Sequence, residues 1–329
     1  MLRNEPVKNR SILITVLAIM MNQLGFWLHA AVTVVPDRLS VDGVVKAYAL
    51  FWEGSDSKRW RTTGFEFQKQ LAVLGFTAQV VEKVNARLEF DFSQINLRDL
   101  YLDFRWGNGL ALRCGQFKPS LNLESETPEQ DLRFDDYTII YQNVFKPAEV
   151  RDIGLALSYR PTCPGKVDYR LFGNVLNGSG ANSGDNNNWK DLSCRMVVKP
   201  FAEKEFWFGG SGYYGFVGAS AVRWLGVAGE AKLKQKGFLT QAEFIFRRYQ
   251  NRITLAGFVE ASNDYGFFVP GTRLELISRD DGKFQVRGLA SLGMEIVENR
   301  LKVLLGYQYH TLLGDWGYQG IIAQLQAVL

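Results

Sequence analysis

Histidine, cysteine and proline are scarce in this chain of 329 residues, which contains two, three and nine of them. The cysteines, Cys114, Cys163 and Cys194, show no C-x-x-C spacing, and an odd number argues against a disulfide framework in an exported protein. A hydrolase would need a nucleophile, a base and an orienting group together, and no G-x-S-x-G motif is present. The sequence therefore predicts no metal site, no cofactor and no enzyme. A membrane-embedded hydrolase that uses Ser291 and His310 is the alternative.

Charge is also close to balance, because 38 basic and 34 acidic residues give a formal net charge of +4. Proteins that bind nucleic acid usually gather basic residues on one face, so no nucleic-acid partner is expected. Long apolar runs are absent beyond the N-terminus, and the mean hydropathy is slightly negative. These features exclude a bundle of transmembrane helices.

The one strongly apolar run lies near the N-terminus. Three basic residues precede an apolar stretch at 12–21, and Ala30 follows it. A basic, an apolar and a small-residue part in this order are typical of a secretory signal peptide. We expect residues 1–30 to be a signal peptide and residues 31–329 to form the exported domain. An N-terminal membrane anchor is the alternative.

What the chain does contain is a strict alternation of apolar and polar residues. In NARLEFDFS, residues 85–93, Leu88 and Phe90 alternate with Glu89 and Asp91. Successive side chains of a strand point to opposite faces. The stretch therefore predicts a strand with one apolar face and one charged face.

Such segments recur to the last residue, and no amphipathic helix pattern accompanies them. They predict an all-β protein of about sixteen strands. The predicted strands are 41–52, 64–79, 85–93, 97–105, 110–117, 151–160, 167–175, 191–200, 206–214, 222–233, 238–247, 252–262, 272–278, 284–296, 300–309 and 320–329.

The apolar faces cannot all point inward, because a closed barrel of sixteen strands encloses a lumen too wide for side chains to fill. In an outer membrane the apolar face contacts lipid, the charged face lines water, and closure pairs the backbone groups. Short turns, among them VPG at 269–271, alternate with generally longer connections. The longer connections are predicted at 52–63, 118–150, 175–190, 214–222 and 310–319. We therefore predict a transmembrane antiparallel β-barrel with short periplasmic turns and longer extracellular loops. A soluble secreted β-protein is a further alternative.

Two short motifs have a functional and a structural interpretation. Gly210, Gly212 and Gly215 have G-x-G-x-x-G spacing, but a dinucleotide site needs a helix next, and none is predicted. The segment NGSGANSGDNNN, residues 177–188, offers only Asp185 as a carboxylate for Ca²⁺. A strand and a loop are the favoured interpretations.

Several longer motifs follow one another in a particular order. They are RLEFDF, LRDLYLDFR, GQFKPSLNLE, RDIGL, and N-G-x-G-x-N followed by K-D and R-x-x-V-K-P-F, all within residues 85–201. In this order the chain resembles the phosphate-selective porin O and P family of Gram-negative outer membranes. The resemblance implies a porin whose long third loop, 118–150 in this sequence, folds inward and narrows the pore.

The residues expected to line the pore come from the strands and from this loop. Basic residues on the charged faces either bias which solutes enter or pair with acids across strands. Arg87, Arg105 and Arg113 are the preferred candidates for a selective role. The third loop has more acidic than basic residues, which departs from the basic constriction that phosphate selection requires. The predicted pore-lining residues are Arg87, Arg105, Arg113, Lys118, Arg133, Arg170, Arg195, Glu124, Glu126 and Asp131.

The sequence thus predicts an outer-membrane porin for passive diffusion of small hydrophilic solutes or ions, with anions such as phosphate among them. Its expected partners are those solutes, outer-membrane lipid and, by analogy with porins of this width, two further copies in a homotrimer. A structural or binding barrel with a blocked lumen is the alternative function.

Overall fold

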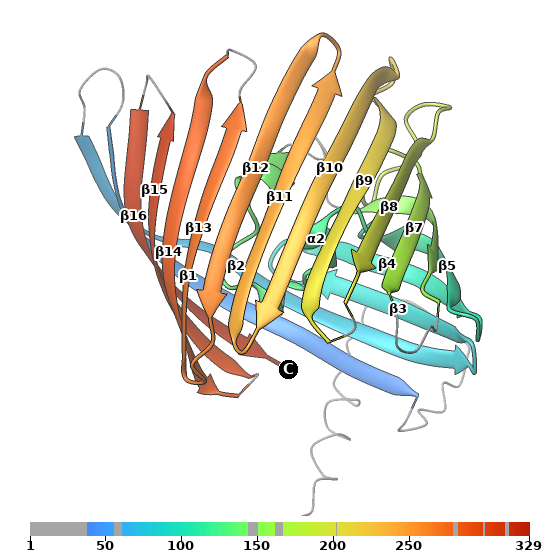
Figure 1. The fold of residues 1–329 in the computed structure, drawn as a ribbon, viewed down its shortest axis with the longest axis horizontal. Helices are drawn as coiled ribbons and strands as arrows, with labels where there is room; N and C mark the ends of the chain where they lie inside the picture. The colour runs from blue at the N-terminus through green and yellow to red at the C-terminus, as the bar shows by residue number, and fades with distance from the viewer. Residues whose placement is uncertain are drawn as a thin grey trace, which may run out of the picture. The chain divides into compact units, whose positions relative to one another are not determined.

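The computed structural model describes residues 38–55, 61–143, 151–161, 167–201, 203–278, 282–298, 300–312 and 316–329. This part of the chain contains sixteen strands and three short helical turns (Figure 1). The strands are β1 Leu39–Ser55, β2 Arg61–Val81, β3 Val84–Asp91, β4 Asn96–Arg105, β5 Leu110–Phe117, β6 Asp152–Tyr159, β7 Asp168–Leu176, β8 Asp191–Lys199, β9 Glu205–Val217, β10 Val222–Gln235, β11 Phe238–Tyr249, β12 Arg252–Asn263, β13 Phe268–Ser278, β14 Phe284–Val297, β15 Leu301–Leu312 and β16 Trp316–Val328. The helical turns are α2 Leu123–Glu126, η1 Glu129–Asp131 and α3 Ile139–Asn143.

The sheet is a closed antiparallel barrel in which every strand pairs with its neighbours in sequence. β1 and β16 complete the ring, with a register that runs from Val44 opposite Val328 to Ser55 opposite Gly317. A closed sheet has no edge, so no row of backbone N–H and C=O groups is left unpaired. The predicted all-β barrel of sixteen strands is confirmed.

The outward face of the barrel is apolar. Leu100 and Leu102, which share the predicted apolar face of β4, are 52% and 42% exposed, whereas Asp99 and Asp103 on either side of them are buried inside. This inverted pattern is that of a barrel surrounded by lipid. In the described part of the chain, no helix has the length and apolarity needed to cross a membrane.

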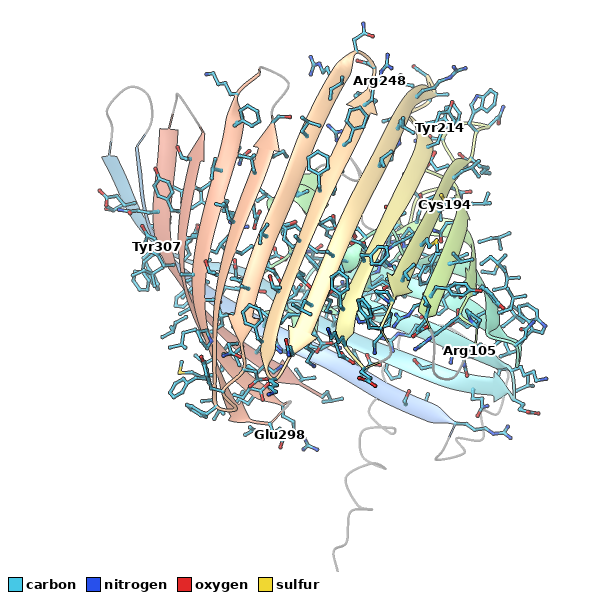
Figure 2. The ribbon with its side chains drawn as sticks, in the orientation of Figure 1. Arg105, Cys194, Tyr214, Arg248, Glu298 and Tyr307 are labelled. Atoms are coloured by element: carbon cyan, nitrogen blue, oxygen red, sulfur yellow. The ribbon has the colours of Figure 1, made fainter. Side chains whose placement is uncertain are left out.

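Exposed aromatic side chains lie near both ends of the strands. We call the end with the connections β2–β3 and β4–β5 the turn end, and the opposite one the loop end. Phe208, Phe238 and Phe268 lie near the turn end, and Tyr214 and Tyr309 near the loop end. Figure 2 shows Glu298 at the turn end, Arg248 at the loop end, and the outward-facing Tyr214 and Tyr307 between them. Two aromatic rows that flank an aliphatic band are typical of transmembrane β-barrels.

The predicted turn at 269–271 is wrong, because β13 begins at Phe268 and the connection lies at 264–267. Pro270 lies opposite Leu292 of β14, while pairing with β12 starts only at Gly271. Proline has no N–H to donate, and at this position no partner on β12 requires one.

The predicted long connections at 52–63, 214–222 and 310–319 are also wrong, because the strands extend into them. β9 continues to Val217 and β10 starts at Val222, so four residues connect them. The G-x-G-x-x-G glycines lie inside β9 and are followed by another strand. A Cβ on Gly215 would lie 2.5 Å from Asp191 Oδ2 and 2.7 Å from Trp224 Nε1. This glycine therefore provides room for two lumen side chains, and no phosphate-binding turn is formed.

The predicted signal peptide, residues 1–30, lies outside the described residues. Given the strand bounds, two connections are long, 118–151 between β5 and β6 and 177–190 between β7 and β8. Both follow strands of only eight or nine residues, β5 and β7. The low wall formed by β3–β8 contrasts with the longer strands β9–β16, and it is where the first long connection enters the barrel.

A charge on the outward band should destabilise the barrel according to its depth. Val259 lies in the central part of β12 and is 56% exposed. We expect Val259→Arg to lower the free energy of unfolding by about 2–4 kcal/mol, because arginine is costly at the bilayer midplane. Val297→Arg, at the turn-end limit of β14, should cost about 0–1 kcal/mol. Urea unfolding in lipid vesicles, followed by tryptophan fluorescence, measures both. Equal losses would contradict a lipid-facing band.

Candidate functional site

Residues 118–143, here called the inner segment, lie inside the barrel wall between β5 and β6 (Figure 1). Its first helical turn, α2, is stabilised by a capping box. The side-chain oxygen of Asn122 accepts a hydrogen bond from Ser125 N at 2.8 Å, and Ser125 Oγ accepts one from Asn122 N at 2.9 Å. Asn122 is fully buried. The two residues thus satisfy each other's backbone N–H groups at the N-terminus of this four-residue turn.

Two buried glutamates of the wall bind the helical turns of the inner segment. Glu243 on β11 accepts hydrogen bonds from Asn122 Nδ2 at 2.8 Å and Leu123 N at 3.1 Å. Glu275 on β13 accepts one from Ile139 N at 2.9 Å. Leu123 and Ile139 begin α2 and α3, where a helix has unpaired N–H groups. Side chains of the wall thus cap both turns.

Further contacts attach the inner segment to strands around the whole barrel. Most of them join a wall side chain to a backbone oxygen or to an acidic side chain. They are Tyr48 of β1 to Asp135 O at 3.2 Å, Arg98 of β4 to Glu129, Arg195 of β8 to Ser120 Oγ at 2.8 Å, Arg273 of β13 to Asp136 O at 3.1 Å, Ser291 of β14 to Arg133 O at 3.2 Å and Gln326 of β16 to Gln130 O at 3.0 Å.

An apolar patch of buried side chains also joins the lumen wall to the inner segment. Ile140 of the inner segment is 1% exposed, and Ile245 of β11 is 0% exposed. The inner segment occupies the width that wall side chains alone cannot fill, and this allows apolar groups to be buried inside. The patch consists of Phe117, Leu121, Ile140, Leu176, Tyr213, Trp224, Ala228, Ile245, Ala256, Phe258 and Ile277.

In the described part of the chain, three cavities beside the inner segment lie toward the turn end, and all three touch Glu126 and Thr127. The first, of about 530 Å³, lies against β10–β16. The second, of about 630 Å³, lies against β1–β5, and the third, of about 910 Å³, lies against β5–β10. Glu126 and Thr127 at the end of α2 therefore stand between the three cavities.

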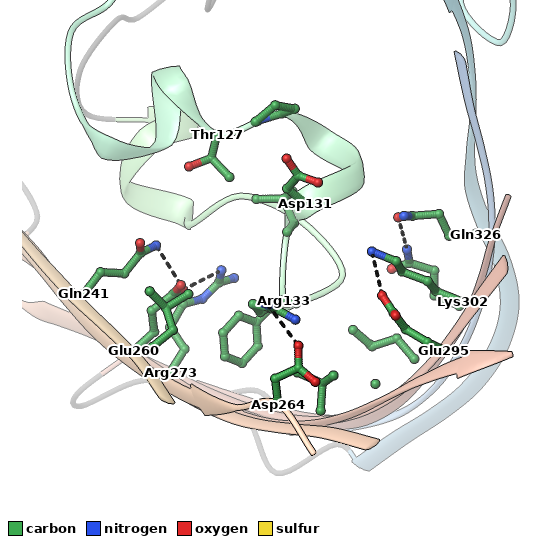
Figure 3. A pocket seen from close by; sticks show the side chains of 18 of the residues that line it. Thr127, Asp131, Arg133, Gln241, Glu260, Asp264, Arg273, Glu295, Lys302 and Gln326 are labelled. Atoms are coloured by element: carbon green, nitrogen blue, oxygen red, sulfur yellow. Dashed lines mark hydrogen bonds and ion pairs between the residues drawn. The ribbon is translucent and has the colours of Figure 1, made fainter. Parts of the chain in front are cut away.

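The cavity against β10–β16 is acidic, and we call it the acidic cavity (Figure 3). Figure 3 shows Thr127 and Asp131 of the inner segment opposite the curved wall, with Glu295 paired to Lys302. Its acidic residues are Glu124, Glu126, Asp131, Glu260, Asp264, Glu295 and Glu298, and its basic residues are Arg133, Lys232, Lys234, Arg273 and Lys302.

The largest of these three cavities has the opposite balance, and we call it the basic cavity. Its basic residues are Arg105, Arg113, Lys118, Arg160, Arg170, Arg195, Lys232 and Lys234, and its acidic residues are Asp103, Glu126 and Glu205. The cavity against β1–β5 has equal numbers of acidic and basic side chains. A solute that passes the inner segment therefore meets a potential that depends on which side it takes.

The three arginines preferred for selectivity are all ion-paired. Arg87 contacts Asp42 and, of the three cavities, lines the one against β1–β5. Arg113 binds Asp103 at 2.7 Å, and Arg105 lies 3.6 Å from the same carboxylate with a side chain that is 63% exposed. Arg105 and Arg113 line the basic cavity.

Two other predicted arginines are placed differently. Arg195 is buried and pairs with Glu230 at 2.6 Å and Glu126 at 3.0 Å, so it holds the inner segment to β8. Arg170 lies over the ring of Trp207, with 4.7 Å from Cζ to the ring centroid. Arg170 also lines the basic cavity.

The predicted residues of the loop have separate surroundings. Arg133 lies 4.0 Å from Asp264, and both line the acidic cavity together with Asp131. Lys118 Nζ donates hydrogen bonds to Glu124 O at 3.1 Å and to Tyr137 Oη at 3.0 Å.

Burial changes the protonation of Lys118 and Glu124, which lie outside the spanning strands. Burial lowers the pKa of Lys118 to about 7. Burial also raises the pKa of Glu124 to about 7, although its carboxylate accepts hydrogen bonds from Thr138, including one from the backbone N at 2.8 Å. Both groups therefore change charge close to neutral pH.

Lys232, Lys234 and Trp207 also line the basic cavity, although none of them is among the predicted pore-lining residues. Lys232 and Lys234 share the face of β10 that carries Glu230, in GEAKLK, so the alternation places them in the lumen. Which residues of the neighbouring strands surround them cannot be read from the local alternation, so their place in the basic cavity could not be predicted.

The remaining motifs form no site among the described residues. Asp185 pairs with Lys190, and the described residues contain no group of three or more His, Cys, Asp or Glu side chains that could hold a metal. Ser291 donates to Arg133 O, whereas the ring of His310 contacts Gln285 and Tyr318. Serine and histidine are not partners here.

Comparison with known proteins gives one family and several similar folds. The sequence model of the family "Phosphate-selective porin O and P" matches residues 52–255. No curated protein sequence matches the chain at a significant level.

Three solved structures illustrate the similar folds. The anion-selective porin from Comamonas acidovorans has a TM-score of 0.63 at 10% identity, over 88% of this chain and 99% of that one. OprB of Pseudomonas putida has a TM-score of 0.64 at 9% identity, over 90% and 95%. The trimer form of OmpT from Vibrio cholerae has a TM-score of 0.53 at 13% identity, over 88% and 100%.

Disrupting the apolar contact should release the inner segment while the barrel stays closed. Ile140→Asp places a carboxylate against the apolar patch, at a cost of several kcal/mol. We expect faster hydrogen exchange at Leu123 and Ile139 and unchanged exchange in the strands, measured by mass spectrometry. Ile140→Val, which costs about 0.5–1.5 kcal/mol, is the control and should keep the protection. Uniformly faster exchange in the strands of the Asp variant would contradict an independently docked segment.

Proposed function

Because the chain belongs to the phosphate-selective porin O and P family and is an outer-membrane porin, we propose that its solutes diffuse through the three cavities around Glu126 and Thr127. In this proposal the inner segment is the inward-folded third loop, and the turn end faces the periplasm. Porins are typically channels and not enzymes, so the proposal includes no reaction.

We further propose that small anions are preferred. The observation that carries this is the composition of the basic cavity, which is the largest of the three and has eight basic and three acidic lining residues. Several of those cations, among them Lys232 and Lys234, have no carboxylate within 4.0 Å in the described part of the chain. Rings of basic side chains favour anions in pores. The family description and the anion-selective porin of similar fold point the same way.

We also propose a homotrimer. β3, β5 and β6 have eight residues each, whereas a tilted spanning strand usually needs about 9–11. A neighbouring copy would shield this sector from lipid, and OmpT of similar fold has a trimer form. Light scattering in mild detergent should give about three times the mass of one chain. A monomer mass for folded protein would contradict the proposal.

The charge preference predicts a reversal potential. Single-channel recording in a planar bilayer, under a tenfold KCl gradient, should give open steps with a reversal potential displaced toward chloride. Lys232→Glu/Lys234→Glu changes the basic cavity from eight basic and three acidic residues to six and five, and should move the potential toward potassium. Lys204→Glu/Lys236→Glu, the same charge change in two turns outside the cavities, should move it little.

Two results would contradict this prediction. A wild-type potential displaced toward potassium would mean that the acidic cavity determines the preference. Absence of open steps from protein that is folded and inserted would favour the alternative function, a barrel whose lumen is closed by the inner segment.

The preference should also depend on pH. Below pH 7 Lys118 is positive and Glu124 neutral, and above pH 7 Lys118 is neutral and Glu124 negative, since both pKa values are about 7. Raising the pH from 6 to 8 therefore makes the inner segment more negative, by up to two charges. We expect the chloride preference to fall with a midpoint near pH 7. Lys118→Met/Glu124→Gln should remove the change, and an unaltered pH dependence in that variant would contradict the assignment.

A further inference from the structure

Trp207 of β9 lies among cations inside the basic cavity. The guanidinium carbon of Arg170 is 4.7 Å from the centroid of its ring, and Lys199 Nζ is 5.4 Å from it. Lys232 of β10 is the residue directly opposite Trp207 in the β9–β10 register. One aromatic ring thus stands near three positive charges, of which Arg170 and Lys232 line the cavity together with the ring.

Two of these cations lack an anionic partner among the residues that the structure describes. Neither Arg170 nor Lys232 has a carboxylate within 4.0 Å among the described residues, and the buried Nε of Arg170 has no hydrogen-bond acceptor. Most other lumen arginines are paired, as Arg113 is with Asp103 and Arg195 with Glu230. Positive charges without a carboxylate partner create a potential that favours an anion in this part of the cavity.

From this geometry we propose that the basic cavity holds a binding site for aromatic carboxylates, built on Trp207, Arg170 and Lys232. A guanidinium that stacks on one aromatic face can stack on a second one, so a flat ring extends the pair formed by Arg170 and Trp207. The carboxylate of the solute then supplies the negative charge that Arg170 and Lys232 lack. Phe172, which also lines the cavity, adds apolar surface.

Phosphate and acetate fit this arrangement less well. Both can accept hydrogen bonds from the cations, but neither has a ring to pack on Trp207. Stacking on aromatic side chains contributes about 1–3 kcal/mol per ring in nucleic-acid complexes. The indole should therefore distinguish benzoate from the smaller anions, while the cations serve all of them. This inference rests on the proposed function for solute entry, but the binding itself can be measured without conduction.

The first experiment is block of the KCl current by benzoate, acetate and phosphate in planar bilayers. We expect benzoate to block at lower concentration than acetate. Trp207→Leu should raise the half-blocking concentration of benzoate about tenfold, in line with a stacking contribution of about 1–3 kcal/mol, and leave acetate and phosphate unchanged. Trp106→Leu, in a turn outside the cavities, is the matched control and should have no effect.

Arg170→Gln gives the second variant, and should weaken the block by all three anions. Each variant is first shown to be folded by its heat-dependent mobility in gel electrophoresis. The proposal is overturned if Trp207→Leu leaves the benzoate block unchanged, or if it weakens acetate and phosphate block equally.

Calorimetry of detergent-solubilised protein with benzoate separates this proposal from the proposed function. If benzoate binds the wild-type protein but not Trp207→Leu, while the wild-type protein gives no open steps in bilayers, the binding site is retained and the proposed diffusion path is rejected. Open steps without benzoate binding would reject the site alone.

Discussion

Closure of the sheet is the constraint on which the rest of the structure depends. Because β16 pairs with β1, the barrel has no edge and its outer face can contact lipid. Closure by sixteen strands also creates a lumen wider than the wall side chains can fill. The inner segment fills part of this wide lumen with buried apolar side chains and leaves cavities beside it.

The inner segment is held by interactions of two kinds. The apolar patch around Ile140 and Ile245 supplies burial, and Glu243 and Glu275 supply hydrogen-bond acceptors where the helical turns begin. Apolar burial alone does not fix the orientation of the inner segment, because it is not directional. The capping hydrogen bonds alone would let the segment rotate about the two capped turns. Together they determine which side chains of the segment face each cavity, and so where Glu126 divides the space.

The strands could be predicted from the sequence because alternation is local. β5 has the predicted bounds, and the number of strands is the predicted one. Loop lengths were less predictable, since glycine and tyrosine in β9 obscure the alternation and Pro270 resembles a turn signal. The lumen contacts were least predictable. Asn122 and Glu243 are 121 residues apart in sequence, and Ile245 has the same strand phase as the charged lumen residues, with no signal for what covers it.

The distribution of paired and unpaired cations has a consequence for how such a pore can diverge. Arg98, Arg195 and Arg273 hold the inner segment, so replacing any of them changes the shape of the passage along with its charge. Lys232, Lys234 and Arg170 line the passage without holding the segment. Substitutions at these positions can alter which solutes pass while the architecture is kept. Selectivity is therefore free to drift on one side of the lumen, while the remainder is constrained by its structural role.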